Sequence, residues 1–315
     1  MVWRTTIVIE VKNLTKKYGP HLAVDDISFK INEGEVVGFL GPNGAGKSTT
    51  MNILTGFLSA TSGNASIAGF DVLQNPYEAK RRVGYLPEAP PLYTEMTVRE
   101  YLNFVYDLKK AGYPRRQHIA EICRLVKITD VYHRLIKNLS KGYRQRVGIA
   151  QALIGNPEVL ILDEPTVGLD PKQIIEIRTL IKQLGKNHTV ILSSHILSEI
   201  QAVCERIIII NKGIIAADGK PDALSALLSN EHSVVIRVDG PEAEVTKELK
   251  KLGGVKSVIN HGERTDCFEY VIDPLAGYDI RRSIFELLSR KKWPLLLMQS
   301  NEMTLEDVFL RLTSK

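Results

Sequence analysis

The residues with the clearest chemistry form a glycine-rich loop. Residues 41–49 read Gly-Pro-Asn-Gly-Ala-Gly-Lys-Ser-Thr and directly follow an apolar run at residues 36–40. A strand that delivers such a loop to the start of a helix lets backbone N–H groups surround an anion. In this pattern Lys47 reaches the outer phosphates and the Ser48 hydroxyl binds Mg²⁺. The loop therefore predicts a nucleoside triphosphate site that comprises Gly41, Asn43, Gly44, Gly46, Lys47, Ser48 and Thr49.

Two adjacent carboxylates follow a second apolar run. Residues 159–162 read Val-Leu-Ile-Leu and precede Asp163 and Glu164. We expect these side chains at the edge of the sheet where the phosphate loop also opens. There Asp163 is placed to hold Mg²⁺, directly or through water, and Glu164 to activate the attacking water. A solvated acidic turn is the alternative interpretation, but the pair fits hydrolysis of the bound triphosphate.

Composition limits the class of protein. The chain has 315 residues and a formal net charge of +5, and no apolar run approaches the roughly 20 residues needed to span a bilayer. Its three cysteines are widely spaced, which favours neither a disulfide framework nor a metal site. The basic excess is compatible with a polyphosphate ligand. The sequence has no basic block interleaved with aromatic residues, the pattern that would indicate binding to nucleic acid. These features predict a cytoplasmic protein.

Strands and helices alternate along the first two thirds of the chain. We expect strands at residues 7–11, 27–31, 36–40, 83–86, 159–162, 189–192 and 207–210, and helices at 47–57, 144–155 and 171–184. The strands are too apolar for a one-sided sheet, so a mostly parallel sheet covered on both faces is predicted. Helical spacing over residues 97–137 adds two helices, separated at Gly112-Tyr113-Pro114, to a helical subdomain of about residues 97–155.

The composition changes after Pro221, which predicts domains at residues 1–221 and 222–315. The second domain reads as strands at 233–238, 255–260, 267–272 and 295–298 with helices at 242–252 and 278–290, followed by a last helix at 304–312. This βαββαβ order is typical of a ferredoxin-like fold. Dimer stabilisation, ligand sensing and a passive extension of the fold all remain open as its role.

A third motif occupies residues 139–146, which read Leu-Ser-Lys-Gly-Tyr-Arg-Gln-Arg. Taken alone it is a plausible helix start with Ser140 as the cap. Its serine, however, lies 93 residues after Lys47 and 23 before Asp163. With these spacings the chain, over about residues 7–220, resembles the ATP-binding cassette (ABC) family, whose signature is Leu-Ser-Gly-Gly-Gln. The resemblance implies a P-loop NTPase fold with a mixed sheet core and a helical subdomain.

The resemblance also assigns roles to individual residues. Tyr18 matches the aromatic residue that stacks on adenine, and His195 matches the histidine that contacts the γ-phosphate. Asp170, in Gly168-Leu169-Asp170, matches the loop that aligns two subunits. Ser140 and Gly142 of one copy would cover the nucleotide of another. The family resemblance thus implies an ATP-dependent homodimer that encloses two ATP molecules with Mg²⁺.

Three positions depart from the family pattern. Lys141 replaces the first signature glycine and Tyr143 replaces the signature glutamine. Glu88 stands where the family usually has a glutamine that senses Mg²⁺ and the attacking water. Its carboxylate can still coordinate a metal, so Glu88 joins Ser48 and Asp163 as a candidate metal ligand.

The motifs resemble the exporter branch of the family most closely. Leu-Pro-Glu at residues 86–88, the motif at 139–146 and Leu-Glu-Asp-Val-Phe at 305–309 are similar to multidrug and gliding-motility-associated subunits. This branch implies a separate integral membrane permease and a position at the cytoplasmic face of the membrane. The alternative is a soluble family member with a ribosome- or assembly-associated role, and a regulatory switch is a second rival. A membrane partner would favour export.

Overall fold

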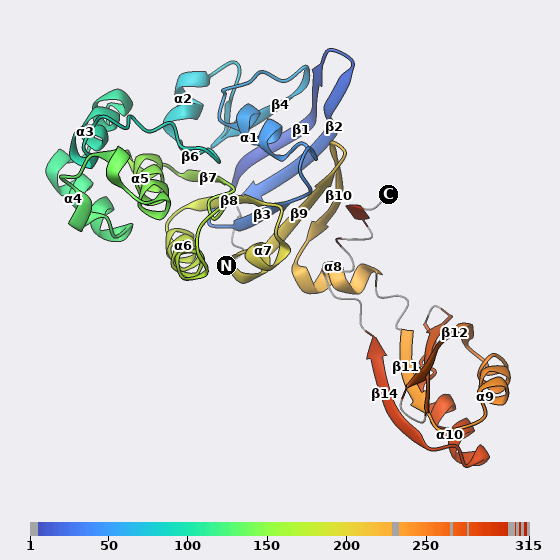
Figure 1. Cartoon of the computed structure of the whole chain (residues 1–315). Coiled ribbons are helices and arrows are strands. Elements are labelled where there is room, and N and C mark those ends of the chain that lie inside the picture. Colours follow the sequence, from blue (N-terminus) through green and yellow to red (C-terminus); the bar gives the residue numbers. More distant parts are fainter. Residues whose placement is uncertain are drawn as a thin grey trace, which may run out of the picture. The chain divides into compact units, whose positions relative to one another are not determined.

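Figure 1 shows the chain as a computed structural model, which describes residues 6–228, 233–264, 267–275, 277–301, 306, 309 and 312–313. The chain forms two compact units, which divide between Pro221 and Asp222. Within the described residues, no helix is long and apolar enough to cross a membrane.

A six-stranded sheet forms the centre of the first unit. Its strands lie in the order β10-β9-β3-β8-β7-β6. The bounds are β3 Val36–Leu40, β6 Val83–Leu86, β7 Val159–Asp163, β8 Thr189–Ser194, β9 Arg206–Asn211 and β10 Ile214–Gly219. All pair in parallel except β10, which is antiparallel to β9. The predicted mostly parallel sheet is confirmed, and the residues of β7 and β8 are all buried, as expected for strands covered on both faces.

A second, antiparallel sheet comprises β2-β1-β4-β5, with bounds β1 Ile7–Tyr18, β2 His21–Asn32, β4 Ser62–Ile67 and β5 Phe70–Asp71. Here β1 and β2 are longer than predicted, because they continue to a tight turn at which Tyr18 pairs with His21. Register shifts between β1 and β2 interrupt the alternation of side chains, so the sequence gives no clear strand pattern there. The longer hairpin carries Tyr18 to the tip of the sheet.

Four helices of the first unit connect its strands: α1 Lys47–Leu54, α2 Pro76–Arg81, α6 Pro171–Leu184 and α7 Leu197–Val203. The predicted bounds of α6 are confirmed. Helix α1 ends before the predicted Phe57, because Gly56 adopts a left-handed φ of 66° that terminates a helix. Helices α2 and α7 are short and were not predicted.

The helical subdomain contains α3 Val98–Lys109, α4 Arg115–Leu125 and α5 Lys141–Leu153, with short 3-10 turns at Thr129–Val131 and Ile136–Asn138. The predicted break between the first two helices is confirmed. Helix α5 begins three residues before the predicted start at Arg144. Ser140 caps it, since the Ser140 Oγ accepts a hydrogen bond from the Tyr143 N–H at 3.4 Å.

The second unit contains α8 Pro221–Leu228 at the division, then β11 Ser233–Val238, α9 Glu242–Leu249, β12 Val255–Arg264, β13 Cys267–Pro274, α10 Arg281–Lys291 and β14 Leu295–Asn301. Its sheet is antiparallel in the order β12-β13-β11-β14. The predicted βαββαβ order and ferredoxin-like arrangement are confirmed. The last predicted helix spans residues 304–312. Only its positions 306, 309 and 312 are among the described residues, and the rest of the helix lies outside them.

Candidate functional site

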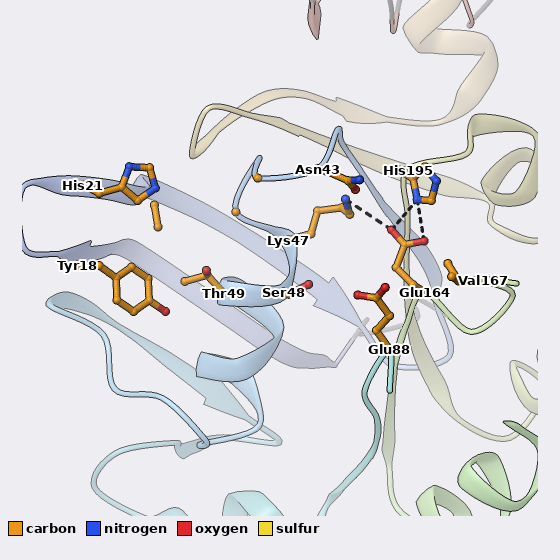
Figure 2. A pocket seen from close by; sticks show the side chains of 13 residues that line it. Tyr18, His21, Asn43, Lys47, Ser48, Thr49, Glu88, Glu164, Val167 and His195 are labelled. Carbon is orange, nitrogen blue, oxygen red and sulfur yellow. Dashed lines mark hydrogen bonds and ion pairs between the residues drawn. The ribbon is translucent and has the colours of Figure 1, made fainter. Parts of the chain in front are cut away.

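A cleft of about 520 Å³ opens at the carboxyl ends of strands of the six-stranded sheet, and Figure 2 shows the side chains that line it. The cleft brings together side chains from the β1–β2 hairpin, the phosphate loop, the segment after β6 and the ends of β7 and β8. They are Tyr18, His21, Ala23, Asn43, Gly44, Gly46, Lys47, Ser48, Thr49, Glu88, Glu164, Val167 and His195. Most of the residues predicted for the nucleotide site thus share one cavity.

The phosphate loop packs closely against neighbouring backbone at two glycines, where an added side chain would have no room. Gly46 precedes α1 with a left-handed φ of 107°, and a Cβ atom there would lie 2.6 Å from the Ala23 carbonyl oxygen. A Cβ atom on Gly41 would lie 2.3 Å from the Ile210 carbonyl oxygen. The loop therefore presents its backbone N–H groups and the start of α1 to the cleft, which is the arrangement that binds phosphate.

Lys47, Glu164 and His195 form a connected group at one end of the cleft (Figure 2). The buried Lys47 ammonium donates to the Gly41 carbonyl oxygen at 2.7 Å and lies 3.6 Å from Glu164 Oε1. His195 Nδ1 lies 3.0 Å from both carboxylate oxygens of Glu164. The carboxylate therefore lies between an ammonium and an imidazole, next to the phosphate loop.

The Glu164 backbone is held in an unusual conformation. Its φ is 48°, in the left-handed region that costs free energy for residues other than glycine. Its N–H donates to the carbonyl oxygen of Ser193 at 3.2 Å and to the Ser193 hydroxyl at 3.1 Å. These contacts from β8 hold the turn that aims the Glu164 side chain into the cleft.

Asp163 occupies a different position from the neighbouring carboxylate. It is 2% exposed, accepts a hydrogen bond from the Ser193 hydroxyl, and is absent from the lining of the cleft. Burial and the Asp163 charge raise the pKa of Tyr85 well above its usual range. The structure thus places Asp163 in the buried interior at Ser193, outside the cleft lining to which Glu164 belongs.

Oxygen ligands for Mg²⁺ are present but do not form a complete cage. The cleft contains the hydroxyl of Ser48 and the carboxylates of Glu88 and Glu164, which are the hard oxygen donors that Mg²⁺ prefers. Among the described residues, no group of three or more His, Cys, Asp or Glu side chains is arranged to hold a metal ion. Such a site fits Mg²⁺ that arrives with phosphate oxygens as its other ligands.

Ser140, Gly142 and Asp170 lie outside the cleft lining. Ser140 caps α5, and Asp170 caps α6 by accepting a hydrogen bond from the Gln173 N–H at 2.9 Å. The two helix starts lie side by side, because a Cβ atom on Gly142 would come within 2.6 Å of the Gln173 side chain. One copy of the chain therefore carries its predicted nucleotide-site residues on two separate surfaces, the cleft and the adjoining starts of α5 and α6.

His21, Ala23 and Val167 line the cleft although the sequence analysis did not select them. His21 pairs directly with Tyr18 across the β1–β2 turn. In Figure 2 these two side chains lie at the end of the cleft opposite Glu164 and His195. A hairpin assignment for residues 7–32 would have placed His21 beside Tyr18.

Comparisons with known proteins agree with this geometry. The family model "ABC transporter" matches residues 24–167. The chain is 33% identical to the linearmycin resistance ATP-binding protein LnrL of Bacillus subtilis (strain 168), over 98% of this chain and 99% of the relative. It is 34% identical to the Nod factor export ATP-binding protein I of Burkholderia orbicola (strain AU 1054), over 98% and 97% of the two chains.

A solved structure matches the first unit. The dimeric, post-hydrolysis structure of the ATP-binding cassette MJ0796 with ADP and phosphate superposes with a TM-score of 0.61 and 29% sequence identity. The match covers 67% of this chain and 98% of that cassette. The part of the chain that carries the cleft is therefore built like a cassette solved with hydrolysed nucleotide.

Proposed function

Since the chain belongs to the ABC transporter ATP-binding proteins and is an ATP hydrolase of that family, we propose that it drives export through a separate membrane-spanning permease. Two relatives that match nearly the whole chain support this proposal, a Nod factor export protein and a linearmycin resistance protein. Under this proposal the chain works at the cytoplasmic face of a membrane. It acts as one half of an ATP-dependent homodimer, and it needs no nucleic acid.

The division of the site into two surfaces is the observation that carries the homodimer in this proposal. The cleft holds Lys47, Glu164 and His195, whereas Ser140 and Gly142 lie at the start of α5, outside its lining. A two-fold pair of chains would place the α5 start of each copy over the triphosphate in the cleft of the other. ATP then becomes the contact that closes the dimer, and hydrolysis removes it.

In this proposal, residues at different points along the cleft contact different parts of the ATP molecule. The adenine stacks on Tyr18, and the phosphates extend along the loop to Lys47, at the end of the cleft that holds Glu164 (Figure 2). Mg²⁺ held by the Ser48 hydroxyl, and by Asp163 through water because Asp163 lies outside the cleft lining, would neutralise charge on the phosphates. Lys47 leaves Glu164 for the phosphates, which frees that carboxylate to accept a proton from water. His195 Nδ1 keeps the carboxylate oriented.

The acidic residue at position 88 leads to a prediction about Mg²⁺. Glu88 lines the cleft with Glu164, so a second carboxylate faces the triphosphate. Repulsion between these charges is relieved by Mg²⁺. We therefore expect Glu88→Gln to bind ATP more tightly than the parent at low Mg²⁺ and about equally at saturating Mg²⁺. Titration of both proteins with ATP across a Mg²⁺ series measures this, and equal affinities throughout would show that Glu88 carries no such role.

A groove of about 640 Å³ on the same unit is suited to the permease. It combines the apolar side chains of Tyr77, Leu108 and Tyr113 with four basic ones, Lys80, Arg81, Lys109 and Lys110. Leu108 is 69% exposed, and Tyr77 and Tyr113 in the same groove are also exposed, so these side chains offer an apolar patch and not a single exposed residue. Burial lowers the pKa of Lys109 to about 8. We propose that a cytoplasmic segment of the permease with apolar and acidic side chains binds here.

This proposal is tested by co-purification of the full chain from detergent-solubilised membranes. We expect one integral membrane protein in stoichiometric amount, and we expect Leu108→Asp to remove it without changing ATP hydrolysis by the isolated chain. Phe285→Asp, at an apolar residue of α10 that is 57% exposed, is the matched control and should retain the partner. Recovery of ribosomes in place of a membrane protein would contradict the proposed transport role. Equal recovery of the partner with Leu108→Asp would contradict the proposed groove.

A further inference from the structure

We propose that Glu199 is a positioning residue for ATP hydrolysis, which links the segment after Glu164 to the segment before His195. The inference rests on the proposed roles of Glu164 and His195. Glu199 lies on α7, is 4% exposed, and is absent from the cleft lining, so it does not touch the nucleotide site directly. Its effect must therefore pass through its neighbours.

The Glu199 carboxylate joins two segments that are distant in sequence. Its Oε2 accepts a hydrogen bond from the Thr166 hydroxyl at 2.5 Å and another from the Ser194 hydroxyl at 3.1 Å. Both hydroxyl residues are buried. Hydrogen bonds to a charged acceptor in a buried site are stronger than neutral ones, so this oxygen is a firm anchor for both segments.

These contacts close a ring around the reacting groups. Thr166 lies two residues after Glu164, and Ser194 directly precedes His195. On the cleft side, the Glu164 carboxylate and His195 Nδ1 are joined at 3.0 Å. On the buried side, Glu199 joins Thr166 to Ser194. The position of Glu164 relative to His195 is thus fixed by contacts on the cleft side and on the buried side.

The ring also supports a strained backbone. Glu164 has a left-handed φ of 48°, a conformation that contacts with the surrounding chain must support. Ser193 holds the N-terminal side through the Glu164 N–H, and Glu199 holds the C-terminal side through Thr166. Loss of the second anchor lets the turn relax and moves the carboxylate.

The charge of Glu199 is a separate matter from its hydrogen bonds. The Nη2 of Arg178 lies 3.8 Å from Glu199 Oε1. At this separation, near the outer limit of an ion pair, the attraction is weaker than in a close pair, and a glutamine at position 199 retains an oxygen that can accept both hydroxyl hydrogen bonds. The geometry therefore requires an acceptor at this position more than it requires a charge.

The decisive experiment measures kcat and KM for ATP in Glu199→Ala, Glu199→Gln and the parent, alone and in a Glu164→Gln background. We expect Glu199→Ala to lower kcat roughly 10–100-fold with KM changed less than about 3-fold, and Glu199→Gln to stay within about 3-fold of the parent. In the Glu164→Gln background, Glu199→Ala should lower the residual turnover less than about 2-fold, because the group it positions is already lost.

The outcomes separate this inference from the roles on which it rests. Equal losses from Glu199→Ala in both backgrounds would overturn the positioning role, whereas an unimpaired Glu164→Gln enzyme would overturn the assignment of Glu164. Gln201→Ala, at an exposed position of α7, is the control and should match the parent. If Glu199→Ala does not fold, Thr166→Val and Ser194→Ala each remove one of the two hydrogen bonds to Glu199, and Ser194→Ala also removes the acceptor of the Ile196 N–H. Parental kcat in both of these variants would then overturn the proposal.

Discussion

Replacing Glu164 with glutamine is expected to lower the ATP turnover number by about 10²–10⁴-fold, the range for loss of a positioned general base. The glutamine amide keeps the size of the side chain but cannot accept a proton from water. It also removes a negative charge 3.6 Å from the Lys47 ammonium, beside the proposed triphosphate. We therefore expect ATP affinity to be equal to or higher than that of the parent. Phosphate release under saturating ATP, together with a binding titration, measures both quantities.

The matched control changes a carboxylate outside the cleft. Glu158 directly precedes the strand that ends at Asp163, and its side chain is 56% exposed beside Arg82. Glu158→Gln alters the charge of the protein by the same amount as Glu164→Gln, so it should hydrolyse ATP like the parent. Parental turnover in Glu164→Gln would move the general base to another residue of the cleft, of which Glu88 is the nearest chemical equivalent.

The sequence predicts those parts of the site in which the functional residues are close together in the chain. The phosphate loop and α1 are covalent neighbours, so the glycines, Lys47 and Ser48 identify their own surroundings. Asp163 and Glu164, at the end of β7, could be predicted for a similar reason, because two carboxylates at the end of a buried strand are a local pattern that indicates a functional site. Likewise the βαββαβ order of the second unit follows from periodicity that each element carries on its own.

The contacts that the sequence does not predict join segments far apart in the chain. His21 enters the cleft only because β1 and β2 form a long hairpin with register shifts. Glu199 reaches Thr166 across 33 residues, and nothing in the spacing of either residue indicates the contact. Adjacency of Asp163 and Glu164 in sequence also suggests adjacent roles, but β7 ends at Asp163, and the left-handed turn at Glu164 brings only the Glu164 side chain into the cleft.

A pair of complementary variants is expected to restore hydrolysis that neither variant supports alone. Lys47→Ala removes the ammonium of the cleft, and Ser140→Asp places a negative charge at the start of α5. Aspartate caps helices as well as serine does, so α5 keeps its start while the surface repels a triphosphate. Each homodimer should lose about 10²-fold or more in turnover, the scale for one preorganised group that contacts developing charge.

The mixed dimer distinguishes a shared site from two independent ones. Its two composite sites are unequal: one combines the intact cleft with the intact α5 start, and the other carries both substitutions. Heterodimers isolated through two different affinity tags should therefore recover about half of the parental turnover per dimer. The control pairs Lys47→Ala with a chain that carries both substitutions, which leaves no complete site and should stay inactive. Failure of the first pair to recover, with stable heterodimers in hand, would mean that Ser140 acts within its own chain.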